Sequence, residues 1–223
     1  MHPATDDVTV DYVSNLTEPT DKFLCKLSDN WPKFKFAGFK IRDCVSNITL
    51  VDVPESDVDE EATDEDGPDK RVIKYHLGPQ FLQLQMVGLT LNFGIGPKPI
   101  NKMTMVERHY FRGKVIRSYS FDFGFVIPNS TNSWEFIYDL PQLTEQEMQE
   151  IIDAPWEVKS DSFFFADDKL MIHNRAIYNY QPLIWIKWML KWKRSDITWK
   201  KMTANFKVLY DIYYVFYLSL ILI

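Results

Sequence analysis

An alternation of apolar and polar side chains is the feature that most limits what this chain can fold into. Residues 89–95 and 119–127 each place an apolar side chain at every second position. In the second run these side chains are Tyr119, Phe121, Phe123, Phe125 and Ile127. Because successive side chains of a β-strand point to opposite faces, this period of two predicts strands that bury one face.

Several shorter runs have a similar strand-like composition and are separated by turn residues. They span residues 33–41, 48–53, 72–77, 81–87, 104–111, 162–165 and 170–173. The last two flank Ala-Asp-Asp-Lys, which is typical of a hairpin turn. Seven or more short strands with turns between them predict an all-β fold, an antiparallel β-sandwich.

Two short helices are expected to interrupt the strands. The run Thr144-Glu-Gln-Glu147 matches a capping box, in which the first and fourth side chains bond each other's backbone N–H groups. It predicts a helix that extends to about Asp153. Residues 10–16 predict a second, N-terminal helix.

The composition suits one globular domain with an extension. The chain has 223 residues, of which 46% are hydrophobic. A net charge of -6 argues against a dedicated nucleic-acid-binding protein, whose binding surface is basic. Cys25 and Cys44 are the two cysteines, so we expect neither a disulfide framework nor a Cys-rich zinc site. The opening Met-His-Pro-Ala lacks a basic and apolar signal region, so we expect a cytoplasmic protein.

Charge is unevenly distributed along the chain. Residues 52–69 contain ten acidic residues and no basic one, whereas residues 182–223 contain seven basic residues and two acidic ones. We therefore expect a β-sandwich of residues 1–181 that carries a flexible acidic loop at 52–70. An atypical basic, aromatic C-terminal extension follows at 182–223.

The extension allows three interpretations. Trp185, Trp188 and Trp192 share one helical face, as in a basic helix that lies on a membrane surface. A membrane-spanning helix is the second interpretation, although the last charge-free run, residues 212–223, has 12 residues and spanning needs about 20. We favour a variant terminus translated from retained non-coding sequence, because Ile, Tyr, Phe, Leu, Lys and Met fill the segment as A/T-rich codons would.

Motifs of the common enzyme classes are missing from the sequence. There is no phosphate-binding P-loop, no nucleophile elbow and no His-Glu-x-x-His. The run that starts Gly94-Ile-Gly96 has Pro99 where a dinucleotide loop needs its third glycine. The four histidines show no metal-ligand spacing. We therefore expect a protein that is not an enzyme and has no metal and no cofactor.

Glu107 and His109 stand out as polar residues inside the strand-like run 104–111. By alternation they share one strand face, with Arg108 on the other. One interpretation is an exposed strand face that carries a cross-strand ion pair. The other places both at the mouth of an apolar cavity, where they orient a polar group of a ligand. Acid–base catalysis is a weaker interpretation, because no nucleophile or metal accompanies them.

Several runs, taken in order along the chain, resemble one family. They are Phe23-Leu-Cys25, Phe39-Lys-Ile-Arg-Asp43, Val106-Glu-Arg-His-Tyr-Phe-Arg112, Phe121-Asp-Phe-Gly-Phe125, Ile137-Tyr-Asp-Leu-Pro-Gln-Leu143, Ser160–Leu170 and His173-Asn174. With these runs, residues 8–181 resemble the uncoordinated-one-nineteen lipid-binding chaperones of the phosphodiesterase delta-subunit superfamily. Residues 124–134 resemble equally the sibling family, the prenyl-binding delta subunit of rod phosphodiesterase. The motifs at 107–109 and 137–143 favour the first family.

The resemblance implies an immunoglobulin-like β-sandwich whose two sheets part to hold a fatty acyl chain in an apolar pocket. The implied cargo is N-myristoylated proteins such as Gα subunits and Src-type kinases. The implied releasing partner is a GTP-bound Arf-like small GTPase, chiefly at cilia. The residues implied to contact the lipid or the acylated peptide are Tyr75, Phe81, Glu107, His109, Tyr138 and Phe164.

Two positions depart from the family's pattern. Phe164 stands where the family usually has a tyrosine, so any hydroxyl contact to the cargo is lost there. Leu140 replaces a common aromatic residue. Two other functions also stay open. One is a prenyl-binding carrier of the same fold, and the other is a membrane-peripheral adaptor that acts through residues 182–223.

Overall fold

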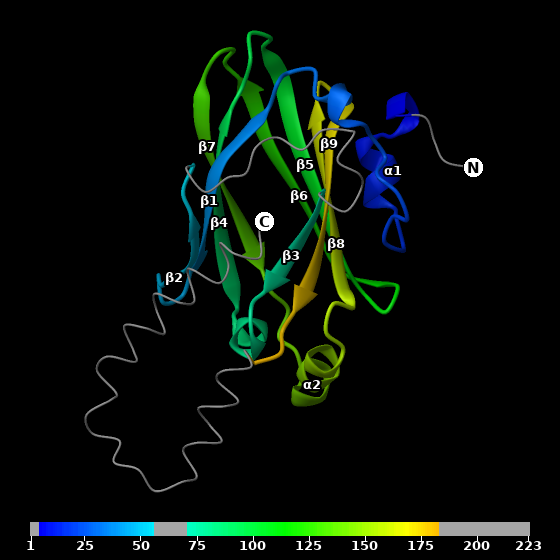
Figure 1. Ribbon diagram of the computed structural model, residues 1–223, viewed down its shortest axis with the longest axis vertical. Coiled ribbons are helices and arrows are strands. Elements are labelled where there is room, and N and C mark those ends of the chain that lie inside the picture. The colour runs from blue at the N-terminus through cyan, green and yellow to red at the C-terminus, as the bar shows by residue number, and fades with distance from the viewer. Residues whose placement is uncertain (1–4, 56–70, 183–223) are drawn as a thin grey trace, which may run out of the picture.

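The protein folds as two β-sheets packed face to face, as its computed structural model shows for residues 5–55 and 71–182 (Figure 1). The four-stranded sheet has the order β2-β1-β4-β7 and consists of β1 (Lys35–Asp43), β2 (Thr49–Val53), β4 (Met86–Gly94) and β7 (Thr131–Asp139). The five-stranded sheet has the order β3-β9-β8-β5-β6 and consists of β3 (Val72–His76), β5 (Ile100–Phe111), β6 (Lys114–Val126), β8 (Val158–Ala166) and β9 (Lys169–Asn179). The predicted immunoglobulin-like, all-β sandwich is confirmed.

One strand pair differs from the predicted antiparallel arrangement. β3 runs parallel to β9, with Tyr75 opposite Tyr178, whereas the other strand pairs are antiparallel. The reason is connectivity, because β3 and β9 are separated along the chain by η5, β4–β8 and α2 and are not joined by a turn. Parallel strands need such a long connection, whereas antiparallel neighbours can be joined by a tight turn.

The alternation in β6 holds only as far as Phe123. Gly124 has a φ of +86°, and the pairing of β6 with β5 shifts register around Met103. Beyond this irregularity Val126 is fully buried, while Phe125 and Ile127 are 57% and 61% exposed. The prediction that Phe125 and Ile127 belong to the buried face was therefore wrong. An irregularity of this kind bends a strand and redirects the side chains that follow it.

Two further segments differ from the sequence predictions. Residues 81–87 were predicted to form one strand, but Pro79–Gln83 form a 3-10 helix, η5, and β4 begins only at Met86. Gly78, with a φ of +74°, precedes η5, and the fixed φ of Pro79 suits a first helical position. β7 was not predicted as a strand, because its first half, Thr-Asn-Ser, has a turn-like composition.

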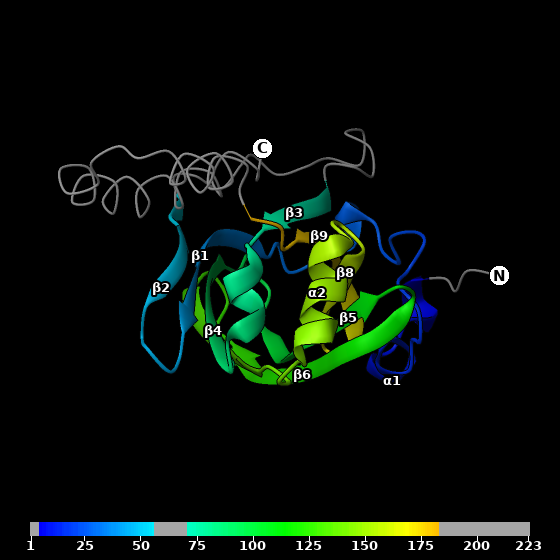
Figure 2. The same cartoon turned by 90° about the horizontal axis from the view of Figure 1, so that it is seen from below.

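The helix predicted from the capping box is confirmed. α2 spans Glu145–Asp153, and the Thr144 hydroxyl accepts a hydrogen bond from the backbone N–H of Glu147 at 3.2 Å. The Glu147 carboxylate in turn accepts the backbone N–H of Thr144 at 2.8 Å. Figure 2 views the sandwich from the end at which α2 lies, and η5 lies at that same end.

The N-terminal residues cover the outer face of the five-stranded sheet. This segment contains η1 (Thr5–Asp7), α1 (Val10–Ser14) and η2 (Leu27–Asp29). We call its residues 8–25 the N-terminal strap. The strap buries Val8, Val13, Leu24 and Cys25 against sheet residues that include Val106, Phe163, Phe165 and Leu170. It lies beside β8 and β9 in Figure 1.

A large apolar cluster fills the space between the sheets at the end where β4 leads into β5. The Phe34 and Phe93 rings stack there with their centroids 4.7 Å apart, and Ile100 and Met103 are fully buried. A second cluster, which includes Leu77, packs η5 and α2 against the opposite end. The space between these two clusters holds the site described below.

Two of the predicted segments fall largely outside the described residues. Of the acidic loop predicted at 52–70, Asp52 and Val53 belong to β2 instead, and Asp52 pairs with Lys40 at 3.0 Å. Residues 56–70 and the extension beyond Pro182 lie outside the described part of the chain, so the domain division stays a prediction. No helix among the described residues is long and apolar enough to cross a membrane.

Gly38 yields a test of the close contact between β1 and β2. Its φ is +112°, and a Cβ there would lie 2.6 Å from the carbonyl oxygen of Val53. We expect Gly38→Ala to lower the free energy of unfolding by more than about 1 kcal/mol, measured by urea denaturation. Gly94→Ala is the matched control, because a Cβ there meets no atom of the described residues within 4 Å. Equal stability of the two variants would contradict this account.

Candidate functional site

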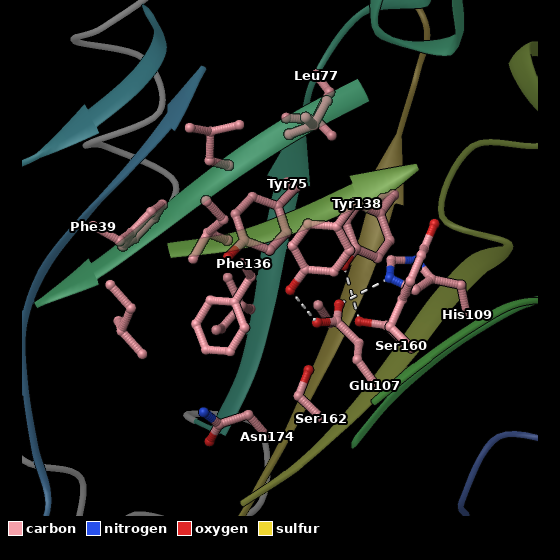
Figure 3. Close-up of a pocket in the computed structure, with 18 of the residues that line it drawn as sticks. Phe39, Tyr75, Leu77, Glu107, His109, Phe136, Tyr138, Ser160, Ser162 and Asn174 are labelled. Atoms are coloured by element: carbon pink, nitrogen blue, oxygen red, sulfur yellow. Dashed lines mark hydrogen bonds and ion pairs between the residues drawn. The ribbon is translucent and has the colours of Figure 1, made fainter. Parts of the chain in front are cut away.

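A cavity of about 320 Å³ lies between the two sheets (Figure 3). The four-stranded sheet contributes mainly apolar side chains from β1 and β4, among them Phe39, Leu89 and Leu91. The five-stranded sheet contributes a mixed wall from β3, β5, β8 and β9. Because alternate residues of each strand share a face, Val87, Leu89 and Leu91 all line the cavity, while Met86 is exposed on the outside.

The polar centre of the cavity is the carboxylate of Glu107. Its Oε1 lies 2.8 Å from Nε2 of His109, two residues along the same strand. Its Oε2 accepts a hydrogen bond from the hydroxyl of Tyr138 at 2.8 Å. Tyr138 belongs to β7 in the opposite sheet, so this hydrogen bond joins the two sheets across the cavity.

Burial decides between the two interpretations of Glu107 and His109. They are only 8% and 9% exposed, so the exposed strand face was the wrong interpretation. The shared face was predicted correctly, because both line the cavity while Arg108 lies on the outer face and donates to the Ser14 carbonyl. The contact between Glu107 and His109 runs along one strand rather than between two strands.

Tyrosines from both sheets add further hydroxyl groups to the cavity. The rings of Tyr75 and Tyr178 stack with centroids 5.3 Å apart, and the Tyr178 hydroxyl lies 2.9 Å from Oγ of Ser160. Burial, followed by the negative charge of Glu107, holds the pKa of Tyr75, Tyr138 and Tyr178 well above the ordinary value. Burial raises the pKa of Tyr180 to about 12. All four hydroxyls therefore keep their protons at neutral pH and can donate hydrogen bonds.

Two residues that line the cavity, His109 and Arg117, each have one buried nitrogen without a hydrogen-bond partner among the described residues. Among the described residues, Nδ1 of His109 forms no hydrogen bond. Because a buried polar atom usually has a partner, this atom marks a place where a ligand group can bond. A neutral His109 that donates through Nε2 to Glu107 presents Nδ1 as an acceptor.

The structure brings all six predicted site residues to the wall of this one cavity. They are Tyr75, Phe81, Glu107, His109, Tyr138 and Phe164. Leu140 lines it as well. The Phe164 ring packs against Phe34 and Phe36, with centroid distances of 5.7 and 6.0 Å. Whether these residues contact a lipid stays a prediction.

Sequence reasoning missed part of the polar wall. Ser160, Ser162 and Tyr178 also line the cavity, together with Asn174 and Arg117. Strand alternation around the predicted Phe164 could have identified Ser160 and Ser162. The register supports this, because Ser162 lies opposite Glu107, and Ser160 lies opposite His109, on the neighbouring strand.

The cavity is suited to binding rather than to covalent chemistry. A long apolar wall with a few convergent polar groups at one place is the usual form of a ligand pocket. Among the described residues, no group of three His, Cys, Asp or Glu side chains is arranged to hold a metal ion. The arrangement can therefore enclose an extended apolar chain and bond a polar group attached to it.

Comparison with known proteins identifies the family. The family described as GMP-PDE, delta subunit, matches residues 28–180. The chain belongs to this family. Protein unc-119 homolog B-B of Xenopus laevis is 42% identical over 174 residues, which cover 76% of this chain and 72% of that protein. Protein unc-119 homolog B of Danio rerio is 43% identical over 180 residues, which cover 78% and 74%. Its Homo sapiens counterpart is 40% identical over 184 residues, which cover 79% and 73%.

Membership of the delta-subunit family confirms the resemblance found in the sequence and the expectation about activity. Proteins of this family are binding and carrier proteins rather than enzymes, and this chain has their lipid-carrier fold. The cavity between the sheets is the feature of this fold that can hold a lipid.

The hydrogen bond between Tyr138 and Glu107 can be tested through stability. Tyr138→Phe leaves one buried carboxylate oxygen without its partner, so we expect the free energy of unfolding to fall by about 1–3 kcal/mol. Tyr119→Phe is the control, because that hydroxyl bonds the Asp139 carbonyl at an exposed position. Chemical denaturation of both variants measures the difference, and an undiminished stability of Tyr138→Phe would refute the account.

Proposed function

We propose that this protein carries N-myristoylated proteins, with the acyl chain held in the cavity between the sheets. The observation that carries the proposal is the combination of an apolar cavity with one buried polar cluster, Glu107, His109 and Tyr138. A saturated acyl chain needs the apolar wall. The amide that joins the chain to its protein needs hydrogen-bond partners, and the polar cluster offers them.

The energetics favour extraction of an acyl chain from a membrane. A myristoyl chain buries about a dozen methylene groups, each worth about 0.8 kcal/mol, before ordering costs are subtracted. A single myristoyl chain binds a membrane only weakly, with a constant of about 10⁴ M⁻¹. A fitted protein cavity can therefore compete with the bilayer without any covalent step.

The six predicted residues receive distinct roles in this proposal. Tyr75, Phe81 and Phe164 contact the apolar chain. Glu107, His109 and Tyr138 meet the polar groups where the chain joins the peptide, and the free Nδ1 of His109 accepts an amide N–H. Phe164 contributes no hydroxyl, so hydrogen bonding to the cargo comes from Glu107, His109, Tyr138 and the serines that line the cavity beside them.

Release and location complete the proposal. A GTP-bound Arf-like small GTPase releases the cargo by binding the sandwich more tightly when its sheets are further apart. A partner can shift the equilibrium between the two states of the sandwich only by its difference in affinity for them.

The cargo class includes Gα subunits and Src-type kinases, and the carrier works in the cytoplasm in association with cilia. Residues 1–181 form the carrier, and the extension at 182–223 is not needed for cargo binding.

One peptide in three forms tests the function. Binding of a fluorescent peptide to the full chain is measured with the peptide myristoylated, farnesylated and unmodified. We expect sub-micromolar affinity for the myristoylated form alone. Preference for the farnesylated form would instead support a prenyl carrier of the same fold. Equal binding of all three would contradict the carrier function and favour an adaptor that acts through residues 182–223.

A matched pair of variants locates the binding site. Leu89→Trp adds a large ring to the cavity wall, so we expect it to weaken binding of the myristoylated peptide at least tenfold. Met86→Trp adds the same ring to the same strand but on its exposed face, so binding is expected to stay unchanged. If both variants bind like the original chain, the lipid does not enter this cavity.

A further inference from the structure

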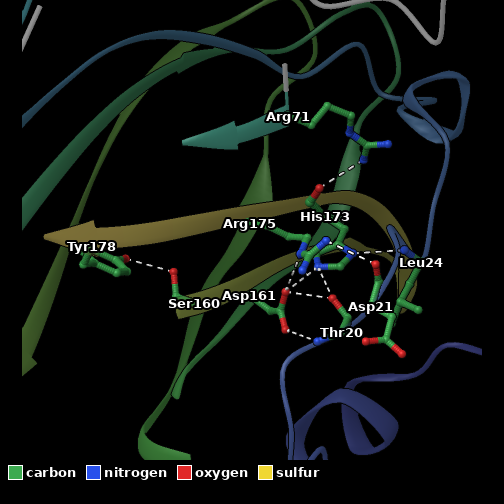
Figure 4. Close-up of polar contacts among 9 residues, drawn as sticks. All are labelled: Thr20, Asp21, Leu24, Arg71, Ser160, Asp161, His173, Arg175 and Tyr178. Carbon is green, nitrogen blue, oxygen red and sulfur yellow. Dashed lines mark hydrogen bonds and ion pairs between the residues drawn. The ribbon is translucent and has the colours of Figure 1, made fainter. Parts of the chain in front are cut away.

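A second buried cluster lies on the opposite face of the cavity wall (Figure 4). Asp161 of β8 is 1% exposed and His173 of β9 is 0% exposed. Their strand neighbours Ser160, Ser162 and Asn174 line the cavity, whereas Asp161 and His173 face the N-terminal strap. Neither residue lines the cavity, and a buried charged group needs partners of its own.

The strap supplies those partners through two backbone N–H groups and the Thr20 hydroxyl. Asp161 accepts the Thr20 backbone N–H through Oδ2 and the Thr20 hydroxyl through Oδ1, each at 2.8 Å. The Leu24 backbone N–H lies 3.0 Å from Nδ1 of His173, and Nε2 of His173 lies 3.1 Å from Oδ1 of Asp161. Residues 20–24 are thereby tied to β8 and β9.

These contacts determine which proton His173 carries. A backbone N–H can only donate, so Nδ1 must accept from Leu24 and cannot hold a proton. The single ring proton is therefore on Nε2, where it points to Asp161. Adding a second proton at Nδ1 would set two N–H groups against each other across 3.0 Å. The strap contact and the charged imidazole are mutually exclusive.

Some of the groups around His173 raise its pKa and others lower it. The Asp161 carboxylate favours the charged ring, whereas Arg71 and Arg175 disfavour it. Arg71 donates to the His173 carbonyl at 3.0 Å and to the Cys25 carbonyl at 3.1 Å, and Arg175 lies 3.6 Å from Asp161. Burial is the largest influence, and it lowers the pKa of His173 below its ordinary value. Burial also raises the pKa of Cys25 to about 11, so its thiol stays neutral.

Two aromatic rings enclose the remaining faces of the imidazole. Phe163 stacks on it with centroids 4.4 Å apart, and Phe23 of the strap meets it edge-on at 5.3 Å. Neither ring can stabilise an added proton by hydrogen bonding. The imidazole is therefore neutral while the strap is bound to it, and a charged ring regains solvation only when the strap moves away.

We propose that Asp161 and His173 form a proton-sensitive latch that fastens residues 20–25 of the strap to the back of the cavity wall. The latch is closed while His173 is neutral and opens when the ring is protonated. Opening removes strap residues such as Leu24 and Cys25 from the outer face of the wall that holds Ser160, Ser162 and Asn174. The latch does not depend on the proposed function, because no ligand takes part in it.

The sign of the pH dependence follows from the neutral state of the latched ring. A histidine whose pKa is lowered in the closed state contributes stability that is fully present above its ordinary pKa and is lost as pH falls below it. With an ordinary pKa of about 6.5 in the released state, lowering the pH from about 7.5 to 5.5 favours release by up to about 10-fold.

Hydrogen exchange of the full chain tests the latch without any ligand. Exchange is resolved to single amides and divided by the intrinsic rate at each pH. We expect the protection of the Leu24 and Thr20 amides to fall several-fold, up to about 10-fold, between pH 7.5 and 5.5. Protection in β4, which does not touch the strap, is expected to stay constant.

Two variants separate the latch from a general effect of acid. His173→Asn keeps an acceptor oxygen near the position of Nδ1 but cannot titrate, so its Leu24 protection should be the same at both pH values. His76→Asn removes a histidine that contacts the Gln181 carbonyl, away from the strap, and should keep the pH-dependent fall of the original chain. Constant Leu24 protection in the original chain would overturn the proposal, and so would a fall that persists in His173→Asn.

Discussion

The hydrogen bond that Tyr138 donates to Glu107 is the interaction on which the site depends. A carboxylate inside a protein is costly unless both oxygens are bonded, and here one partner comes from the same strand and the other from the opposite sheet. The two sheets are therefore held together beside the cavity by a polar contact rather than by complete apolar packing. Between the core around Phe93 and the helices at the other end, space is left for a ligand.

One face of the five-stranded sheet lines the cavity, and the other face packs against the N-terminal strap. Alternate residues of β5, β8 and β9 point inward to the cavity, as Glu107, Ser162 and Asn174 do. The residues between them point outward to the strap, as Phe163 and His173 do. The outer face carries apolar side chains such as Val106, Phe163 and Phe165, and the strap covers them.

Strand periodicity predicted much of the wall and failed where backbone geometry overrides it. The shared face of Glu107 and His109 follows directly from a period of two, as do the inward positions of Leu89 and Leu91. The exposed position of Phe125 does not follow from this period, because it depends on the positive φ of Gly124 and on a register shift between β5 and β6. The meeting of Tyr138 with Glu107 is a contact between sheets, which no local pattern encodes. Resemblance to a family placed Tyr138 in the site, whereas the partners of His173 emerged only from the structure.

The central claim is that an acyl chain lies inside the cavity between the sheets. A myristoylated peptide with a nitroxide spin label on the last carbon of the chain tests this claim directly, because the label broadens the nuclear magnetic resonance signals of nearby methyl groups. The account predicts the strongest broadening at Leu89, Leu91 and Met105, which line the cavity, and weaker broadening at Val45 and Ile48, which are exposed outside it. Broadening confined to the exposed methyl groups, with the cavity signals unchanged, would contradict the account.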